Sequence, residues 1–125
     1  MEMICSMLES VAVVRAEGSY FPSGSFQRNL AEKMGGLLAQ GCKRVIVDIE
    51  LSYIDSMGLG ALFIEAKRLT DAGGRLAAYS RNERIRAIFR VVKCSLPFML
   101  FETEEQALCY VLYGTRWLVR AGSTA

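Results

Sequence analysis

A carboxylate and a hydroxyl stand side by side at the start of a predicted helix, in Asp55-Ser56. An apolar strand and a short loop precede this pair, and Gly58 and Gly60 follow it closely. The first N–H groups of a helix have no intrahelical partner, and they carry the positive end of the helix dipole. A phosphate on Ser56 would therefore meet unpaired hydrogen-bond donors. The pattern suits a hydroxyl to which a charge is added and from which it is removed.

Nucleophilic catalysis by Ser56 would require a base within reach. The chain contains no histidine, which removes the usual general base and the commonest metal ligand. Lys67 and carboxylates are the remaining bases, and the sequence contains no Ser-x-x-Lys motif. We therefore expect no enzyme activity, no metal site and no cofactor.

Helix stability offers a second explanation of the same residues. Serine and aspartate are both common N-caps, and from the spacing alone we favour a capping or first-turn role for Ser56, with Asp55 as the other candidate cap. Gly58 and Gly60 suit close packing of the helix on a sheet, and they equally suit close approach of a partner's backbone. Spacing alone therefore leaves both roles open.

The composition is that of one globular domain. The chain has 125 residues, of which 52% are hydrophobic and 22% charged. Its net charge of +2 is too small to indicate nucleic-acid binding. It contains neither a recognisable targeting segment nor a run of about 20 apolar residues, so we expect a cytoplasmic protein without a membrane span. The cysteines are far apart, and we expect mostly buried, reduced thiols at Cys5, Cys42, Cys94 and Cys109.

Strand and helix patterns alternate along the chain, which predicts an α/β domain with a partly parallel sheet. Strands are predicted over 4–8, 11–16, 45–49, 75–79 and 98–101. Helices are predicted from Ser25 to Gly41, over 56–72, from Asn82 to the break at 94–97, and from Thr103 to 112. Ser25 and Asn82 are the predicted caps of their helices, and Thr103 with Gln106 forms a capping box. The predicted apolar face of the second helix consists of Leu59, Leu62, Phe63, Ala66 and Leu69.

Two further segments have both a functional and a structural explanation. Residues 81–93 are basic, and they suit either an anionic partner or the solvated face of an amphipathic helix. We favour the solvated face, because the arginines fall between the apolar positions. The turn Tyr20-Phe21-Pro22 is either an exposed aromatic contact or a loop whose rings pack on the first helix. The basic residues are Arg81, Arg84, Arg86, Arg90 and Lys93.

Three motifs together resemble the sulfate-transporter and anti-sigma-factor-antagonist (STAS) domain family. They are the strand Val-Ile-Val-Asp at 45–48, the run Tyr-Ile-Asp-Ser-Met-Gly-Leu-Gly-Ala-Leu at 53–62, and the turn Gly-Gly-Arg-Leu at 73–76. The resemblance spans residues 4–112. It implies a mixed sheet of four to five strands with about four helices packed mainly on one face. Residues 1–112 would form this domain, and residues 113–125 a C-terminal helix extension and tail.

The stand-alone members of this family are bacterial regulators of transcription. The resemblance implies a protein that binds an anti-sigma factor with serine kinase activity, is switched by phosphorylation of Ser56, and has a phosphatase as a further partner. Phe21 stands where members of this type carry an acidic residue, and it would offer an apolar contact instead. The implied partner surface comprises Phe21, Asp55, Ser56, Met57, Gly58, Leu59 and Gly60.

Two other functions stay open. One is a constitutive scaffold or accessory subunit of a lipid transporter or signalling complex. The apolar Phe21 and the bulky Met57 favour this function. The other is small-ligand or nucleotide binding at the same helix start. We rank it last, because the sequence has no Walker-type glycine loop.

Overall fold

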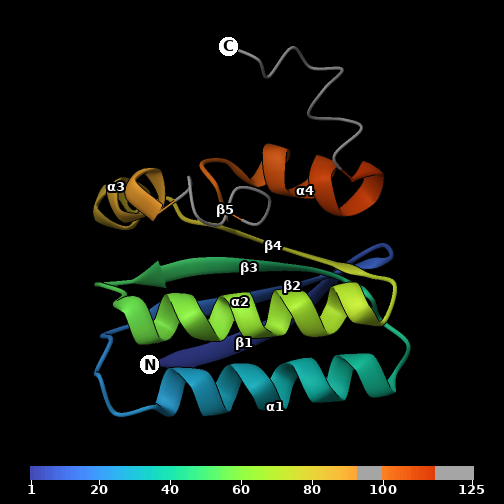
Figure 1. The fold of residues 1–125 in the computed structure, drawn as a ribbon, viewed down its shortest axis with the longest axis horizontal. Coiled ribbons are helices and arrows are strands. Elements are labelled where there is room, and N and C mark those ends of the chain that lie inside the picture. Colours follow the sequence, from blue (N-terminus) through green and yellow to red (C-terminus); the bar gives the residue numbers. More distant parts are fainter. Residues whose placement is uncertain (93–99, 115–125) are drawn as a thin grey trace.

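The computed structural model describes residues 1–92 and 100–114. In these residues strands and helices alternate after an initial hairpin, as the sequence predicts (Figure 1). The strands are β1 (Glu2–Leu8), β2 (Val11–Gly18), β3 (Arg44–Leu51), β4 (Arg75–Tyr79) and β5 (Leu100–Phe101). The helices are α1 (Ser25–Ala39), α2 (Ser56–Asp71), α3 (Glu83–Val92) and α4 (Glu104–Tyr113).

The strands form one mixed sheet in the order β1-β2-β3-β4-β5. The hairpin strands β1 and β2 are antiparallel, whereas β2, β3, β4 and β5 run parallel to their neighbours. In β3 the side chains from Val45 to Ile49 are all buried, which explains why this strand reads as a continuous apolar run. The predicted mixed α/β sheet is confirmed.

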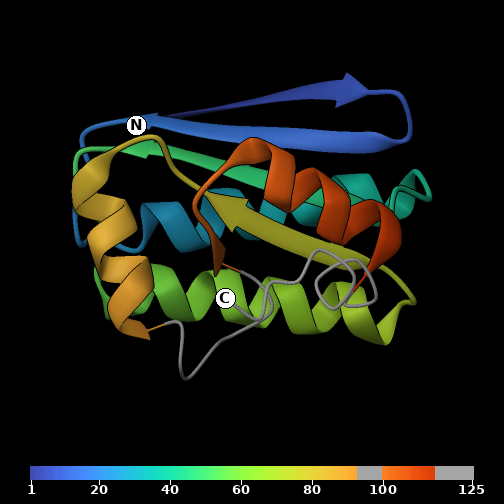
Figure 2. The same ribbon diagram turned by 90° about the horizontal axis from the view of Figure 1, so that it is seen from above.

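Helices cover both faces of the sheet, unequally. α1 and α2 lie on one face, and α4 lies on the other (Figures 1 and 2). Ile85 and Phe89 of α3 belong to the same buried cluster as the side chains of α1 and α2. α4 contributes Ala107 and Val111 to a smaller core over Ile46. The predicted packing mainly on one face is therefore confirmed, with α4 as the helix on the second face.

The turn from α2 into β4 requires a glycine. A Cβ on Gly74 would lie 2.1 Å from the carbonyl oxygen of Lys43, and the next residue, Arg75, donates its N–H to that same oxygen at 2.8 Å. Gly73 has φ +86°, the left-handed conformation that commonly ends a helix. α2 ends at Asp71, one residue before the predicted end at 72, and the chain then turns into β4 as predicted.

Two of the three predicted helix caps are correct. Asn82 accepts the N–H of Arg84 at 2.9 Å, and Thr103 accepts the N–H of Gln106 at 3.1 Å. The prediction for Ser25 is wrong, because Gly24 is the N-cap and Ser25 is the first helical residue. Gly24 has φ +83°, so its left-handed backbone makes the entry into α1 and no side chain caps it.

The predicted inward position of Phe63 on α2 is wrong, since 47% of its surface is exposed. The buried stripe runs through Leu62, Glu65 and Leu69. Glu65 fits this stripe because Arg68 pairs with its carboxylate at 3.0 Å. A buried carboxylate needs such a partner, and the sequence pattern alone favours a phenylalanine at the core.

The cysteines differ from the prediction as well. Cys5 is exposed, and Cys42 and Cys109 are partly buried, all three as free thiols. Cys94 lies outside the described residues, as do Lys93, the first part of the predicted strand over 98–101 and the tail beyond Gly114. No helix in the described part of the chain is long and apolar enough to span a bilayer.

Ion pairs occupy most of the basic segment. Arg81 pairs with Asp48 at 3.6 Å and with Glu50 at 3.5 Å, and Arg90 pairs with Glu83 at 2.8 Å. Ile85 and Phe89 are buried on α3, so the described part of this segment after Arg81 is an amphipathic helix with an exposed basic face, as we favoured. Asp48 is the buried residue among these ion pairs, and Arg15 also pairs with it at 3.3 Å.

Burial, followed by the hydrogen bond and the negative charge of Glu50, raises the pKa of Asp48 to about 6. An unfolded aspartate titrates near pH 3.9, so between these two values the folded chain holds the extra proton. The free energy of unfolding then falls as the pH rises through this window. As the pH rises from 4 to 7, the free energy of unfolding of the wild type should therefore fall by about 1–3 kcal/mol relative to that of Asp48→Asn.

Urea denaturation of both proteins at several pH values measures this difference. Asp71→Asn, at an exposed position of α2, controls for the loss of one negative charge. A difference between Asp48→Asn and wild type that stays constant with pH would contradict the buried-carboxyl explanation.

Candidate functional site

Asp55 caps α2. Its backbone is extended, with φ −110° and ψ −175°, and its carboxylate accepts the N–H of Gly58 at 3.0 Å. Ser56 is the first residue of the helix and is exposed. Its hydroxyl has no hydrogen-bond partner within the described part of the chain. The capping role that spacing allowed for Ser56 therefore belongs to Asp55.

A second donor reaches the same carboxylate oxygen. The hydroxyl of Tyr20 donates to Oδ1 of Asp55 at 2.5 Å. Tyr20 lies in the loop after β2 and Asp55 in the loop after β3. Because these neighbouring strands are parallel, both loops leave the sheet at the same side, where the strands have their carboxyl ends. The hydrogen bond thus ties the β2–α1 loop to the start of α2.

Further contacts hold Tyr20 in place. Its N–H donates to the hydroxyl of Ser52 at 3.2 Å, and its ring meets the rings of Phe26 and Tyr53 edge-on at centroid distances of 6.0 and 6.4 Å. The aromatic turn therefore divides: Tyr20 packs inward on α1 and α2, while 62% of the surface of Phe21 is exposed. Tyr20 therefore packs on the first helix, and whether the exposed Phe21 contacts a partner stays a prediction.

The hydrogen bond between Tyr20 and Asp55 affects the charge state of both side chains. The bond from Tyr20, with backbone N–H donors at the helix start, lowers the pKa of Asp55. Burial and the neighbouring carboxylate raise the pKa of Tyr20 to about 12. At neutral pH the pair is therefore a carboxylate and a protonated phenol, and a full negative charge stands next to Ser56.

The two glycines of the motif have different surroundings. A Cβ on Gly58 would lie 2.6 Å from Cγ1 of Ile54 and 3.1 Å from the hydroxyl of Tyr20. A Cβ on Gly60 would meet nothing within 4 Å. Close packing therefore explains Gly58, and it does not explain Gly60.

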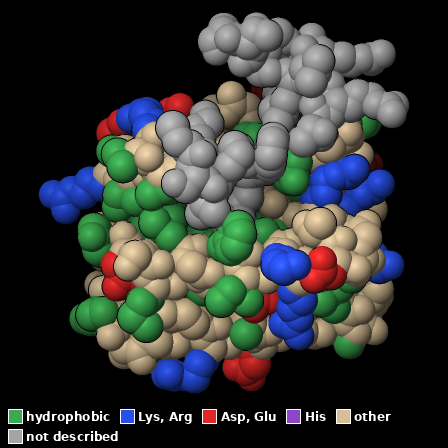
Figure 3. Space-filling view, in the orientation of Figure 1, with side chains coloured by type: hydrophobic (Ala, Val, Ile, Leu, Met, Phe, Trp, Pro, Cys, Tyr) green, Lys and Arg blue, Asp and Glu red, His purple; other side chains and the backbone are tan. Residues whose placement is uncertain are grey.

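The expected partner-surface residues also divide by exposure. Met57 is 56% exposed, and with Asp55 and Ser56 it forms the start of α2, while Phe21 lies on the loop that Tyr20 ties to this helix. Gly58 and Leu59 are buried, so their side of the helix faces the core. Hydrophobic side chains gather on the surface between the start of α2 and α3 (Figure 3). Whether a partner binds these residues stays a prediction.

Sequence analysis missed the role of Tyr20 in this site. A tyrosine directly after a strand, one strand away from the Asp55 loop, is the only signal that points to it. The described residues hold no group of three or more histidine, cysteine or acidic side chains that could bind a metal ion.

The family model for the STAS domain matches residues 9–107. The chain belongs to the STAS domain family. The match includes the strand β3, the Asp55-Ser56 junction and the whole of α2, so it confirms the resemblance carried by these motifs. A comparison with curated protein sequences gave no match.

Solved structures share the fold of this STAS domain. An anti-sigma factor antagonist from Mycobacterium paratuberculosis is 19% identical, with a TM-score of 0.71 over 88% of this chain and 92% of its own. The anti-sigma factor antagonist SpoIIAA in its unphosphorylated form is 21% identical, with a TM-score of 0.63 over 88% of this chain and 96% of its own. The phosphorylated form of the Bacillus cell fate determinant SpoIIAA is 20% identical, with a TM-score of 0.59 over 86% and 96%. At these identities the likeness establishes the fold.

Removal of the Tyr20 hydroxyl tests the contact between the two loops. We expect Tyr20→Phe to raise the pKa of Asp55 towards its ordinary value, as seen by NMR titration of the carboxyl carbon. At neutral pH the variant should lose about 1.5–3 kcal/mol of stability, the usual range for a hydrogen bond to a charged group. Since the folded pKa of Asp55 is depressed, this loss should shrink as the pH falls below about 4. Tyr53→Phe is the matched control, and an unchanged titration of Asp55 in Tyr20→Phe would refute the contact.

Alanine at the two glycines should have opposite effects on stability. Gly58→Ala forces Ile54 and Tyr20 apart, and we expect it to cost about 1–3 kcal/mol. Gly60→Ala fills open space in a helix, and we expect a gain of up to about 1 kcal/mol. Chemical denaturation measures the free energy of unfolding of both variants, and each variant serves as the control of the other. Equal effects would show that the packing at Gly58 is not what its surroundings indicate.

Proposed function

We propose that this STAS domain is an anti-sigma-factor antagonist that binds an anti-sigma factor with kinase activity and is released when Ser56 is phosphorylated. The observation that carries the proposal is the exposed hydroxyl of Ser56 at the first position of α2, which has no hydrogen-bond partner among the described residues. Asp55 already caps the helix, so the fold does not require this hydroxyl. A kinase can reach it without unfolding the domain.

The local electrostatics suit a switch. A phosphate on Ser56 would gain roughly 0.3–1 kcal/mol from the helix start, and it would stand beside the charged carboxylate of Asp55. Tyr20 and Gly58 hold that carboxylate in place with two hydrogen bonds. Within the domain the attraction and the repulsion oppose each other. Like charges placed together across an interface cost several kcal/mol, so the larger effect falls on partner binding.

The surroundings of Ser56 suit protein contact. Phe21, Tyr53 and Met57 are exposed apolar side chains on the two loops and the helix start that Tyr20 joins. Exposed apolar groups around a polar centre are typical of protein interfaces. Phe21 would supply an apolar contact to the anti-sigma factor. The glycine at position 60, with open space around it, leaves room for the partner's backbone.

The structural neighbours support this role. Two of them carry the name anti-sigma factor antagonist, and SpoIIAA has been solved with and without its phosphate. A fold of this shape therefore tolerates a phosphoryl group. By the same proposal the protein acts in the bacterial cytoplasm, regulates transcription without catalysis of its own, and depends on a phosphatase for reset.

Phosphorylation by the anti-sigma factor kinase encoded nearest to its gene tests the switch. After incubation with this kinase and ATP, we expect mass spectrometry to find one phosphate, on Ser56. Ser56→Ala should accept none and still bind the kinase, whereas Ser56→Asp should bind at least 10-fold more weakly by calorimetry. Ser25→Ala changes a serine at the first position of another helix, α1, and serves as the matched control.

Two results would contradict the switch. One is phosphate on another residue with Ser56 unmodified, and the other is unchanged binding by Ser56→Asp. Unchanged binding, together with copurification of a transporter ATPase, would favour the constitutive scaffold instead.

A further inference from the structure

The strand β1 leaves one edge of the sheet open. It pairs with β2 along its whole length, from Glu2 opposite Glu17 to Leu8 opposite Val11, and no other described strand lies beyond it (Figure 2). It has seven residues, compared with eight in each of β2 and β3, and all of them but Met3 are exposed. At the opposite edge of the sheet, the described part of the chain includes two residues of β5.

This open edge lacks the usual protection against pairing. Exposed edge strands are commonly blunted by proline, lysine, a bulge or inward-pointing charges. β1 contains none of the first three, and Glu2 at its end is its single charged residue. Ile4, Met7 and Leu8 are large apolar side chains that it exposes. Such an edge is suited to accept another strand.

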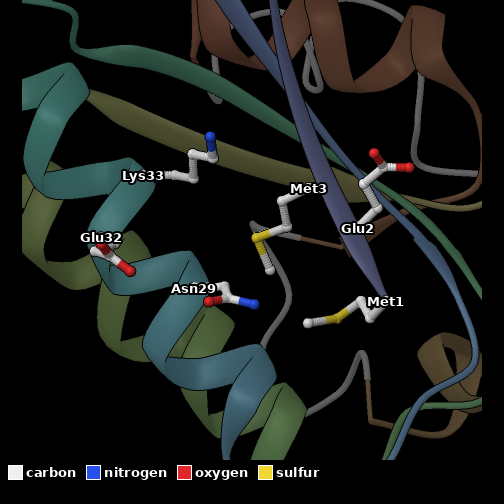
Figure 4. A pocket seen from close by; sticks show the side chains of 6 residues that line it. All are labelled: Met1, Glu2, Met3, Asn29, Glu32 and Lys33. Carbon is white, nitrogen blue, oxygen red and sulfur yellow. The ribbon is translucent and has the colours of Figure 1, made fainter.

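The helix layer also leaves β1 free. Between β1 and α1 lies a cavity of about 480 Å³, lined by Met1, Glu2 and Met3 on one side and by Asn29, Glu32 and Lys33 on the other (Figure 4). α1 therefore does not close over the edge strand. A strand added beside β1 would meet the sheet edge without displacing a helix.

We propose that β1 pairs antiparallel with β1 of a second copy of the chain, about a two-fold axis at Cys5. Met3, Cys5 and Met7 lie on one face of the strand with a spacing of two, and this row reads the same in both directions. The axis sets Met3 opposite Met7 of the second copy and Cys5 opposite its own equivalent. Each of these three sulfur-containing side chains then lies opposite another one. A strand of unrelated sequence would not give this match.

The charges fit the same register. Like charges directly opposite each other destabilise a strand pair. With the axis at Cys5, the single acidic residue Glu2 falls opposite Leu8 of the second copy, and no like charges face each other. Ile4 falls opposite Ser6. The pairing joins two five-stranded sheets into one continuous sheet with isologous contacts.

The dimer leaves both Ser56 sites accessible. α2 packs against β4 and α1, while the pairing edge is β1, two strands beyond β3. The second copy therefore approaches the half of the sheet that is remote from α2. One dimer would present two switch sites to its partners.

The oligomeric state of the full chain tests the proposal. Sedimentation equilibrium at micromolar to millimolar concentration should show a monomer–dimer equilibrium, and Met7→Lys should weaken the dimer at least 10-fold. Met7 is 58% exposed, so the monomer should tolerate the lysine. Ile64→Lys, at a 64% exposed position of α2, is the matched control and should leave the equilibrium unchanged. A monomer at all concentrations, or equal effects of the two lysines, overturns the pairing.

Oxidative cross-linking tests the register. Directly opposed residues in an antiparallel pair have Cα atoms about 4.5–5.5 Å apart, which a disulfide can bridge. Copper phenanthroline should therefore yield a linked dimer whose tryptic map contains the Cys5–Cys5 peptide, and Cys5→Ser should abolish it. A dimer linked only through other cysteines, or one that persists in Cys5→Ser, refutes the axis at Cys5.

Discussion

The carboxylate of Asp55 is the group on which the candidate site depends. Its hydrogen bond from the N–H of Gly58 caps the start of α2, and its hydrogen bond from the hydroxyl of Tyr20 holds the β2–α1 loop beside it. Two segments that are 35 residues apart in the chain are joined through one oxygen atom. Because this oxygen performs the capping, the neighbouring hydroxyl of Ser56 is left free for chemistry that the fold itself does not need.

Parallel strand order makes this joint possible. β2 and β3 run side by side in the same direction, so the loops that follow them emerge together. Gly58 then allows Tyr20 and Ile54 to come close to the first turn of α2. A side chain at this glycine would push apart the residues that hold Asp55. The geometry at Ser56 thus rests on backbone topology first and on side-chain contacts second.

The sequence predicted the elements better than the contacts between them. The limits of β4 and α2 follow from local signals, namely Gly73-Gly74 and the apolar spacing. Phe63 shows where such signals fail, because the pairing of Glu65 with Arg68 is a contact that periodicity does not encode. Tyr20 shows the same limit at the site: its partner lies on another loop, and only the sheet order brings the two together. Asp55 and Ser56 could be singled out early since their roles depend on one helix start.

Two aspartates only seven positions apart show how surroundings, rather than residue type, decide charge. Asp48 is buried on β3 beside Glu50, and its pKa is raised to about 6. Asp55, beyond the end of the same strand, accepts hydrogen bonds from a phenol and from backbone N–H groups, and its pKa is lowered. Burial makes the first carboxyl take up a proton at a higher pH than usual, while hydrogen bonding keeps the second ionised to a lower pH than usual. A phosphate added at Ser56 would therefore stand beside a carboxylate that stays ionised, and the resulting density of negative charge is what a partner would sense.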